Sequence, residues 1–518
     1  MRRSEIPLYS QIIVYVGYLQ LSVVSSLPRL LKKTKSICPE CLALVDAKVV
    51  EENGRVALVK TCSKHGSFED TYWSDYGQYA RFEKYESLGD GISNPRTKTV
   101  KACPYDCGIC PEHRSQTVLA IIDITNRCNL TCPVCFANAA ATGYVYEPTC
   151  EQIEEMLRNL RRNRPIAPTA LQFSGGEPTV REDLPQLAQR AKELGFEHVE
   201  INTNGIKISQ SADYIRELMD AGADTFYLQF DGLDDNVYRK TRGIPLLDVK
   251  MKAIENARKV GLDSMVLVPT LVKGVNDHQV GEIIFFAAKN RDVVRGVNFQ
   301  PVSICGRIDR SKLREMRVTI SDFLRLAEEQ TKGILKASDF YPVPFVVPVA
   351  KAVGALKGRL YSEFTAHQHC GAATFILVED GKITPITRLV NVDKFMDSMR
   401  KVYDLASKGQ RTRAKLQMTM AMRHVGFDML QGLMTGVLTS GSYEALGKFM
   451  RKMIMISSMH FMDPYNFDIQ RVQRCCIHYA VPDGRIIPFC TMNSIHRPDI
   501  EKQFSVPVSS WKETKAKS

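Results

Sequence analysis

Three cysteines on one short loop carry the chemistry that the rest of this 518-residue chain must position. Cys128, Cys132 and Cys135 are spaced C-x3-C-x2-C, shortly after an apolar, β-branched stretch that predicts a strand. Three thiolates at this spacing can bind three irons of a [4Fe–4S] cube and leave the fourth iron open. An open iron can bind a substrate or cofactor, so the spacing favours a reaction centre over an electron relay. The alternatives for the triplet alone are a zinc or ferredoxin-type ligand set.

A second C-x3-C-x2-C loop lies upstream, at Cys103, Cys107 and Cys110. Zinc ligation is the alternative, but three thiols on so short a loop favour an iron–sulfur cube. Because this loop precedes the first predicted strand of the core, we expect an auxiliary cluster there and not the cluster that binds the cofactor.

A third set of ligands is predicted near the N-terminus. Cys38 and Cys41 form a C-x2-C knuckle, and Cys62 and His65 follow the alternating strand sequence of residues 47–60. Two such knuckles joined by a hairpin make a tetrahedral site for zinc or for a single rubredoxin-like iron. His65 could instead cap a turn, but three thiols need a fourth partner. A closed four-ligand site leaves no position for substrate, so the expected role is structural.

The C-terminal part of the chain holds four more candidate ligands, Cys370, Cys475, Cys476 and Cys490. Adjacent cysteines cannot easily bind one cluster together, so we expect one of Cys475 and Cys476 to be unligated. The remaining thiols are expected to complete the auxiliary cluster begun at Cys103 and to build another.

Repeated strand and helix patterns surround the central loop. The strand candidates are Val118–Ile124, Ala170–Phe173, His198–Ile201, Thr225–Phe230, Ser264–Thr270 and Val297–Pro301, and the helix candidates include Glu151–Arg162 and Leu184–Leu194. This alternation predicts βα units. Six units are fewer than the eight of a closed barrel, so we expect an α/β fold with an open partial (βα)6 barrel. Its ligands should lie at the carboxyl ends of the strands.

Small and polar residues follow these strands at the expected edge. They are Gly175, Gly176 and Glu177 after the second strand, Asn202 and Asn204 after the third, and Gln229 and Asp231 after the fourth. Paired glycines let the backbone approach a ligand closely, and a carboxylate beside them can bind an ammonium group. Amide side chains can hydrogen-bond sugar hydroxyls. Tight turns are the alternative for each motif alone, so the prediction rests on their order after successive strands.

The chain divides into four predicted parts: a hydrophobic N-terminal helix at 1–35, a small metal-binding domain at 36–100, the core at 101–320 and a C-terminal iron–sulfur domain at 321–518. Residues 6–28 carry no charge but are interrupted by serines and glutamines. A helix that packs on the body or lies on a membrane surface is therefore favoured over a signal peptide or a membrane span. Residues 411–462 hold ten of the nineteen methionines and predict a helical segment, either a pliable core or an apolar tunnel.

The composition is that of a globular protein, with 44% hydrophobic and 24% charged residues. The fifteen cysteines are an odd number and are clustered, which indicates metal ligands and not a secreted disulfide framework. The predicted compartment is reducing, most simply the cytoplasm. The net charge of +12 fits an anionic partner such as phospholipid head groups or nucleic acid, although a solvated basic surface is the more common explanation.

The central loop resembles the cofactor loop of radical S-adenosylmethionine (radical SAM) enzymes, whose open iron binds the amino and carboxylate groups of the methionine moiety. Gly175-Gly176-Glu177 resembles the element of these enzymes that binds the methionine amine. The resemblance implies that the residues after the third and fourth strands, Asn202, Asn204, Gln229 and Asp231, contact the carboxylate, ribose and adenine.

The whole chain resembles the archaeal tetraether lipid synthases. The shared stretches include Lys101-Ala102-Cys103-Pro104-Tyr105-Asp106-Cys107-Gly108, Asn298-Phe299-Gln300-Pro301-Val302-Ser303 and His369-Cys370-Gly371. This resemblance implies a C–C bond between the terminal carbons of two isoprenoid chains of an anionic phospholipid, at or near a membrane surface. It also implies a low-potential electron donor such as ferredoxin, one or two auxiliary [4Fe–4S] clusters, and no nucleic-acid partner.

Other functions stay open from the sequence. One keeps the radical chemistry and changes the substrate to a peptide or RNA. Another is an iron–sulfur electron carrier, against which the Gly175-Gly176-Glu177 element argues. Zinc at every thiol site is the remaining alternative, which a brown, oxygen-sensitive protein would exclude.

Overall fold

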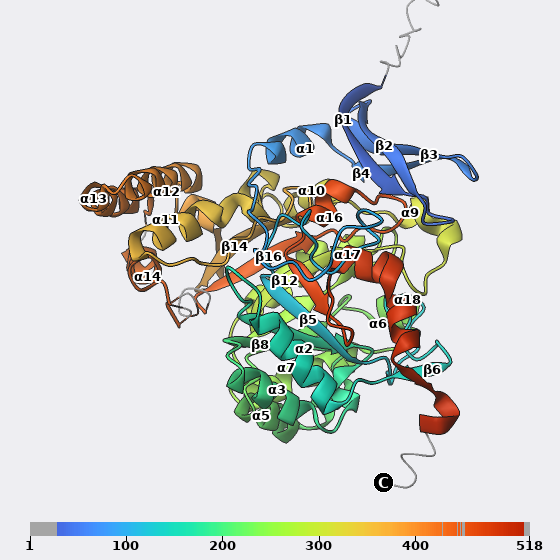
Figure 1. Ribbon diagram of the computed structural model, residues 1–518. Helices are drawn as coiled ribbons and strands as arrows, with labels where there is room; N and C mark the ends of the chain where they lie inside the picture. Colours follow the sequence, from blue (N-terminus) through green and yellow to red (C-terminus); the bar gives the residue numbers. More distant parts are fainter. Residues whose placement is uncertain (1–27, 427, 443, 446, 448–450, 512–518) are drawn as a thin grey trace, which may run out of the picture.

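The computed structural model describes residues 28–426, 428–442, 444–445, 447 and 451–511 (Figure 1). Most of the helix expected at 1–35 falls on residues 1–27 and so lies outside the described part. Its expected end is not helical, because Arg29–Ile37 forms strand β1 and pairs along its length with the next strand. In the part of the chain that the structure describes, no helix combines the length and the apolar character needed to cross a membrane.

The N-terminal unit is an antiparallel meander of four strands followed by helix α1 (Tyr76–Glu83). After β1 come β2 (Leu44–Glu52), β3 (Arg55–Cys62) and β4 (Gly66–Trp73). β2 and β3 form the hairpin predicted between the two cysteine pairs. Its turn, Asn53-Gly54, has both residues at positive φ, as a tight two-residue hairpin requires.

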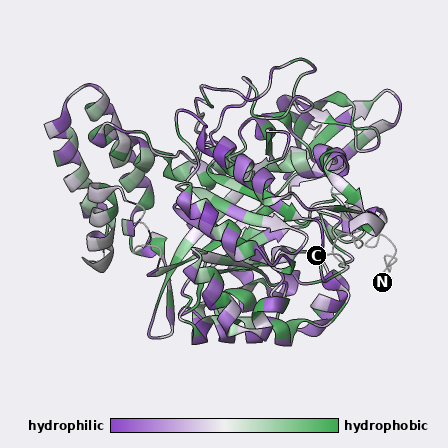
Figure 2. Cartoon of the chain, turned by 60° about the horizontal axis from the view of Figure 1, so that its bottom comes forward, coloured by the Kyte–Doolittle hydropathy of each residue, from purple (hydrophilic) through white to green (hydrophobic). Residues whose placement is uncertain are grey.

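One large sheet forms the core of the molecule, and Figure 2 shows its strands as largely hydrophobic. The six predicted strands are all present: β5 (Leu119–Thr125), β7 (Ala170–Gly175), β8 (His198–Thr203), β9 (Thr225–Gln229), β10 (Met265–Val268) and β12 (Val294–Pro301). They pair in parallel in chain order, with the short β11 (Thr270–Leu271) beside β12. Their carboxyl ends therefore lie at one edge, where the predicted motifs follow them.

Two strands from the C-terminal part extend this parallel run beyond six. β16 (Met453–Met459) pairs in parallel with β12, and β17 (Ile477–Ala480) pairs in parallel with β5. The predicted helix is thus wrong at residues 453–459. Ile454 and Ile456 are β-branched and buried between β12 and β14 (Gly371–Glu379), which favours a strand.

The remaining strands lie at the edges of the sheet or outside it. They are β13 (Tyr341–Pro342), β15 (Lys382–Pro385), β18 (Ile486–Pro488), and the separate pair β6 (Tyr144–Tyr146) and β19 (Ser505–Pro507). β17 and β18 form an antiparallel hairpin, and Gly484 in its turn has φ +85°.

Helices follow the core strands, and most of those between β5 and β10 lie in an outer layer at the bottom of Figure 1. They are α2 (Cys150–Arg161), α3 (Leu184–Glu193), α4 (Ile206–Gln210), α5 (Ala212–Asp220), α6 (Asp235–Arg242), α7 (Leu247–Lys259), α8 (Val280–Lys289) and, after the short α9 (Leu313–Met316), α10 (Ile320–Gln330). α2 begins at the capping box of Thr149 and Gln152, which satisfies the first free backbone N–H groups. The predicted helices at 151–162 and 184–194 are therefore confirmed.

A helical lobe projects from the edge of the sheet at the left of Figure 1. It consists of α11 (Val347–Lys357), α12 (Val392–Ser407), α13 (Arg411–Ala421) and α14 (Asp428–Ser440). Buried Met396 and Met399 and partly buried Met418, Met422 and Met434 belong to one hydrophobic cluster. These contacts favour the pliable-core interpretation of the methionines.

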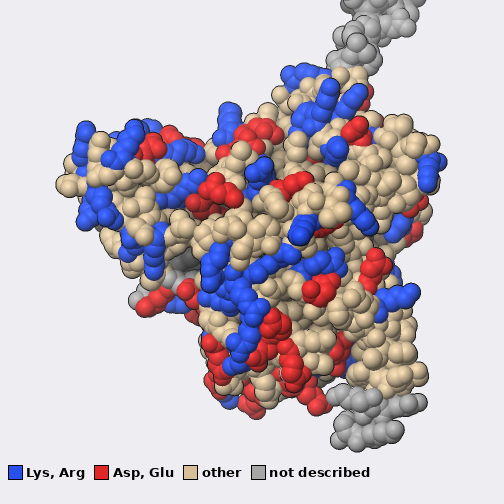
Figure 3. Space-filling model, in the orientation of Figure 1, with Lys and Arg blue, Asp and Glu red and all other residues tan. Residues whose placement is uncertain are grey.

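The end of the chain returns to the carboxyl edge of the sheet. Its elements are α16 (Ile469–Gln473), α17 (Phe489–Thr491), the π-helix η8 (Met492–His496) and α18 (Arg497–Gln503). On the face shown in Figure 3, Lys and Arg side chains are spread over several elements with Asp and Glu between them. This distribution is what a solvated basic surface would show.

Candidate active site and metal centres

One cavity of about 180 Å³ lies at the carboxyl edge of the parallel strands, and Cys128, Cys132 and Cys135 line it. Predicted residues from the ends of three strands line the same cavity: Gly175, Gly176, Glu177, Asn202, Asn204 and Gln229. The structure therefore brings the thiol loop and the strand-end motifs to one place. Asp231, the remaining predicted contact, does not line the cavity and is fully buried.

The donor chemistry of the loop fits an iron–sulfur cluster. Burial raises the pKa of the Cys128 thiol to about 12, and burial also raises that of Cys132 although Arg242 opposes the shift. Iron binding must therefore displace thiol protons, which is the usual coupling between metal affinity and acidity. Three cysteines that line one cavity, one of them buried and two half-buried, are the ligand set that an open-iron cluster needs.

The sequence predicts that Gly175 and Gly176 leave room for a ligand. In the structure the space beside them is occupied by protein backbone. Gly175 has φ +131°, and a Cβ added there would overlap the carbonyl oxygen of Thr125. A Cβ on Gly176 would overlap the carbonyl oxygen of Arg127. The Gly176 N–H donates to the Thr125 carbonyl at 2.7 Å. The two glycines thus let the end of β7 lie directly against the start of the cysteine loop.

The Glu177 carboxylate is buried and accepts hydrogen bonds from β8 and from its own turn. Its Oε1 accepts from the Thr203 and Thr179 hydroxyls at 2.7 and 2.5 Å, and its Oε2 accepts from the Asn204 N–H at 2.6 Å. Burial raises the pKa of Glu177, and these hydrogen bonds oppose that shift. The carboxylate therefore ties the end of β7 to the end of β8. A bond to an ammonium group stays a prediction.

Asn204 connects the end of β8 to the cysteine loop. Its Nδ2 donates to Asn129 Oδ1 at 2.6 Å, and Asn129 follows the first loop cysteine. Asn202 Nδ2 donates to the Ser174 hydroxyl at 3.1 Å, between neighbouring strand ends. These amides, predicted to bind a sugar, also position the loop.

Arg242 is a site residue that the sequence analysis missed. Its guanidinium binds the fully buried Asp231 through Nε at 2.6 Å and Nη2 at 2.9 Å, and its Nη1 donates to the Val134 carbonyl in the cysteine loop. Burial alone would raise the pKa of Asp231, but Arg242 outweighs burial and holds that pKa below its ordinary value. Asp231 thus anchors Arg242. The three basic residues at the end of α6 were the available signal.

The sequence analysis also missed two other basic side chains, one that binds the strand ends beside the cysteine loop and one that binds the loop itself. Lys250 is fully buried, and its Nζ donates to the Asn204 carbonyl at 2.5 Å and to Gln229 Oε1 at 2.9 Å. Arg307 Nε donates to the Cys132 carbonyl at 2.6 Å. Neither residue lies in a motif, so only the fold brings them to the site.

The cavity has one polar and one aromatic side. Gln172, Tyr227 and Gln300 line it from the strands, and Gln300 Nε2 donates to the Tyr227 hydroxyl at 3.3 Å. Phe461 and Phe489 line it from the C-terminal part, with their rings stacked 3.9 Å apart at 23°. Such a cavity suits a flat ligand that carries hydrogen-bonding groups at its edge.

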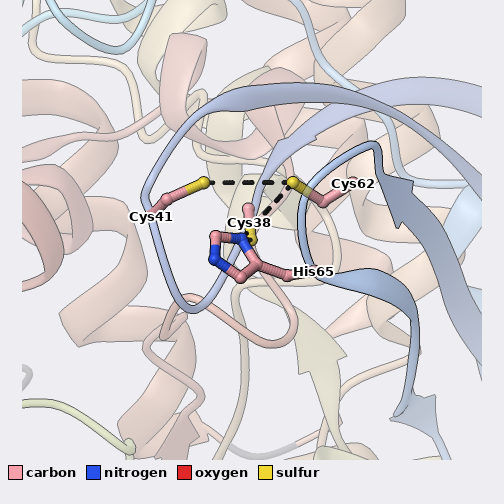
Figure 4. A group of neighbouring side chains, drawn as sticks. All are labelled: Cys38, Cys41, Cys62 and His65. Atoms are coloured by element: carbon pink, nitrogen blue, oxygen red, sulfur yellow. Dashed lines mark hydrogen bonds between the residues drawn. The ribbon is translucent and has the colours of Figure 1, made fainter.

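The N-terminal ligands converge as predicted (Figure 4). The ligand atoms of Cys38, Cys41, Cys62 and His65 all lie within 4.8 Å of one another. His65 Nδ1 is 3.5 Å from Cys38 Sγ and 3.6 Å from Cys62 Sγ, so His65 completes the set and does more than cap a turn. Four soft donors at this spacing fit a tetrahedral zinc or iron ion.

Six other thiols form two further groups. Cys103 lies beside Cys107 and near Cys110, while Cys475 lies near Cys370 and Cys490. Arg471 Nε is 3.5 Å from Cys370 Sγ.

Cys476 lies close to Cys475 and Cys370, but its thiol has other hydrogen-bond partners. It faces Ser115 and Thr365, because successive side chains of an extended chain point to opposite sides. The C-terminal thiols therefore group with one another, and the expectation that they complete the set at Cys103 finds no support in this arrangement.

Comparison with known proteins agrees with this architecture. Residues 122–287 match the family model of the Radical SAM superfamily, and residues 30–74 match that of the HMPTM N-terminal zinc ribbon domain. Fold, site and both matches define a radical SAM protein with an N-terminal zinc ribbon. The predicted cofactors are thereby confirmed: a [4Fe–4S] cluster and S-adenosylmethionine in the core, and a metal ion in the ribbon.

The chain is 50% identical over 494 residues to the 7,8-dihydro-6-hydroxymethylpterin dimethyltransferase of Methanocaldococcus jannaschii, a match covering 93% of this chain and 97% of that protein. It belongs to the family of that enzyme. It is also 26% identical over 182 residues to the GTP 3′,8-cyclase of Thermodesulfovibrio yellowstonii, covering 35% of this chain and 56% of that one. Streptococcus suis SuiB bound to S-adenosylmethionine shares 21% identity with a TM-score of 0.34, covering 43% and 48% of the two chains.

The near full-length match contradicts the predicted lipid substrate. The relative is described as acting on a pterin, so the expected joining of isoprenoid phospholipid chains, and the phospholipid partner at a membrane surface, are corrected. The prediction went wrong because the motifs that carried the resemblance are mostly cysteine loops. Cysteine spacing determines which irons are held and leaves the substrate undetermined.

Proposed function

We propose that this protein is a radical SAM enzyme that methylates a pterin. The observation that carries the proposal is the 50% identity to a pterin dimethyltransferase across 97% of that enzyme. A match over 93% of this chain extends over both the core and the C-terminal part.

The two-sided cavity supports this substrate class. A pterin is a flat heteroaromatic ring with donors and acceptors along one edge. The Phe461 and Phe489 rings offer a stacking surface, and Gln172 and Gln300 offer amide groups to ring nitrogens and to an exocyclic amine or carbonyl. The substrate would lie between the aromatic side and the strand ends.

Cys128, Cys132 and Cys135 would hold the cluster, and S-adenosylmethionine would lie against the ends of β7, β8 and β9. When bound and reduced, this pair supplies a 5′-deoxyadenosyl radical, which can take hydrogen from an unactivated carbon. The protein's own contribution is positioning. The Asn204–Asn129 hydrogen bond and the Arg242–Val134 contact hold the loop in one conformation against the strands.

The two other thiol groups would hold auxiliary clusters. Phe489 lines the cavity and Cys490 is the next residue, so a cluster at Cys370, Cys475 and Cys490 would lie close to the substrate. The buried Arg471 guanidinium beside Cys370 would offset part of the negative charge of such a cluster.

The test is a methylation assay under anaerobic conditions. Reconstituted protein receives 7,8-dihydro-6-hydroxymethylpterin, dithionite as reductant and S-adenosylmethionine as the radical source. Because the radical-forming cleavage leaves the methyl group on methionine, the methyl donor is supplied separately, as excess S-adenosylmethionine in one arm and as a reduced one-carbon carrier in the other, and mass spectrometry follows the pterin. We expect products heavier by one and then two methyl groups, as the relative's name states. Cys132→Ala should abolish them, whereas Cys150→Ala should not, because that exposed thiol lies outside every ligand group. Cofactor cleavage without any pterin product would contradict the proposal.

A further inference from the structure

We propose that His496 is the fourth protein ligand of the auxiliary cluster at Cys103, Cys107 and Cys110. The inference rests on the auxiliary cluster proposed above. Three thiols leave one iron of a cube without a protein ligand. The C-terminal thiols offered for that place by the sequence lie with one another instead, near Arg471. His496 belongs to no motif that the sequence analysis used.

The His496 ring lies at the thiol loop, and its hydrogen bond identifies the nitrogen that is free to bind a metal. The side chain is 9% exposed, and its Nε2 lies 3.0 Å from the carbonyl oxygen of Pro104. A carbonyl only accepts, so Nε2 carries the hydrogen and Nδ1 keeps a lone pair. The ring also contacts the Cys107 thiol.

This arrangement is the one that metal-binding histidines adopt. Such a histidine usually donates its other ring N–H to a carboxylate or a backbone carbonyl, which sets the tautomer and orients the ring. Here the accepting carbonyl belongs to the residue directly after Cys103. The ring and the thiol loop are therefore fixed relative to each other before any metal binds.

The backbone around His496 holds it in place. His496 ends the π-helix η8, a rare form that occurs often at functional sites. The next residue, Arg497, reaches into the core, where its Nη1 binds Asp123 at 2.6 Å and Glu501 at 3.0 Å. The buried ion pairs of Arg497 thus fix the position of the His496 ring beside the thiol loop.

His113 is the competing histidine and the matched control. It follows Cys110 by three residues and is equally buried. Its Nε2 lies 2.9 Å from the Cys475 carbonyl and 3.0 Å from His478 Nε2, whereas the His496 ring contacts the Cys107 thiol of the loop itself. The geometry therefore favours His496 over His113.

The experiment uses the full chain with Cys128, Cys132 and Cys135 replaced by Ala, so that only the auxiliary clusters and the ribbon ion remain. The protein is produced with 15N-histidine, reconstituted anaerobically and reduced with dithionite. Pulsed EPR then measures nitrogen hyperfine coupling to the reduced clusters. Histidine labelling excludes the Arg471 nitrogens from the signal.

We expect a strong 15N coupling that is lost in His496→Ala and kept in His113→Ala. In His496→Cys the coupling should vanish while the iron count is retained, and the midpoint potential should fall, because imidazole ligation raises the potential of iron–sulfur centres. A coupling that survives His496→Ala, or that disappears only in His113→Ala, would overturn the assignment. If Cys103→Ala leaves the iron count unchanged, the auxiliary cluster itself is absent and the earlier proposal fails instead.

Discussion

At Lys250 a buried amine joins the ends of two strands beneath the cofactor loop, through the Asn204 carbonyl and the Gln229 amide oxygen. Burial lowers the pKa of this amine from 10.5 to about 7. The unfolded chain therefore binds one proton more than the folded chain between these two pH values. The free energy of unfolding should therefore rise with pH from about 7 to 10.5. This contribution of Lys250 is lost as the pH falls back to about 7.

Comparison with Lys250→Met tests this linkage. The free energy of unfolding of the wild type, relative to that of the variant, should increase with pH between 7 and 10 with a slope approaching about 1.4 kcal/mol per pH unit. Denaturant titrations at several pH values measure it. Lys252→Met, on the exposed side of the same helix, should follow the wild-type profile. Parallel profiles for wild type and Lys250→Met would show that the amine titrates at its ordinary pKa.

Among the elements, the zinc ribbon is attached to the core by buried charges. Arg317, just before α10, binds Asp70 of β4 at 2.6 Å and Asp463 after β16 at 2.7 Å. All three side chains are at most 5% exposed. Lys32 of β1 binds the buried Asp468 at 2.8 Å, and Tyr72 donates to the same carboxylate. The ribbon is thus held in place by ion pairs that it cannot make alone.

Removing Arg317 should loosen this attachment. Arg317→Met leaves two buried carboxylates without their cation, and we expect a loss of about 3–5 kcal/mol in the free energy of unfolding. Urea titration followed by the fluorescence of the buried Trp73 reports on the ribbon. Arg325→Met breaks an exposed pair with Glu329 in the adjoining helix and should cost less than about 1 kcal/mol. Equal effects of the two substitutions would refute the structural role given to the buried network.

At the scale of the whole molecule, the cavity exists only because the segments after β16 and β18, two strands far apart in the sheet, come together at Phe461 and Phe489. The thiol loop and the strand ends form one side, and the segment after β16 and the hairpin of β17 and β18 bring Phe461 and Phe489 to the other. The aromatic side is supplied by residues more than three hundred positions away from the cysteine loop. Substrate binding should therefore depend on the C-terminal part, and cofactor cleavage on the core.

Phe461→Leu separates these two contributions. Loss of the stacked ring should raise the KM for the pterin by roughly 3- to 10-fold, the equivalent of about 0.5–1.5 kcal/mol for one aromatic pair. The rate of S-adenosylmethionine cleavage without substrate should change little. Phe286→Leu removes a ring from another stacked pair, with Phe230, and should leave the KM unchanged. A KM that is insensitive to Phe461 would place the pterin elsewhere.

Much of the site was predictable because its chemistry is local. Ligands within one loop, such as Cys128, Cys132 and Cys135, need only their spacing to converge, and strand periodicity alone predicted the six core strands. The same holds for Cys38, Cys41, Cys62 and His65, which a single hairpin brings together.

Only the tertiary structure decided what depends on distant packing. Tertiary packing made residues 453–459 a central strand and directed the Cys476 thiol to Ser115 and Thr365. It also placed Arg242 at the cofactor loop and Lys250 at the strand ends beside that loop. The reason is physical: a spacing within one turn or hairpin is set by local backbone geometry. A contact between residues hundreds of positions apart exists only once the whole chain has found the packing that buries its apolar surface.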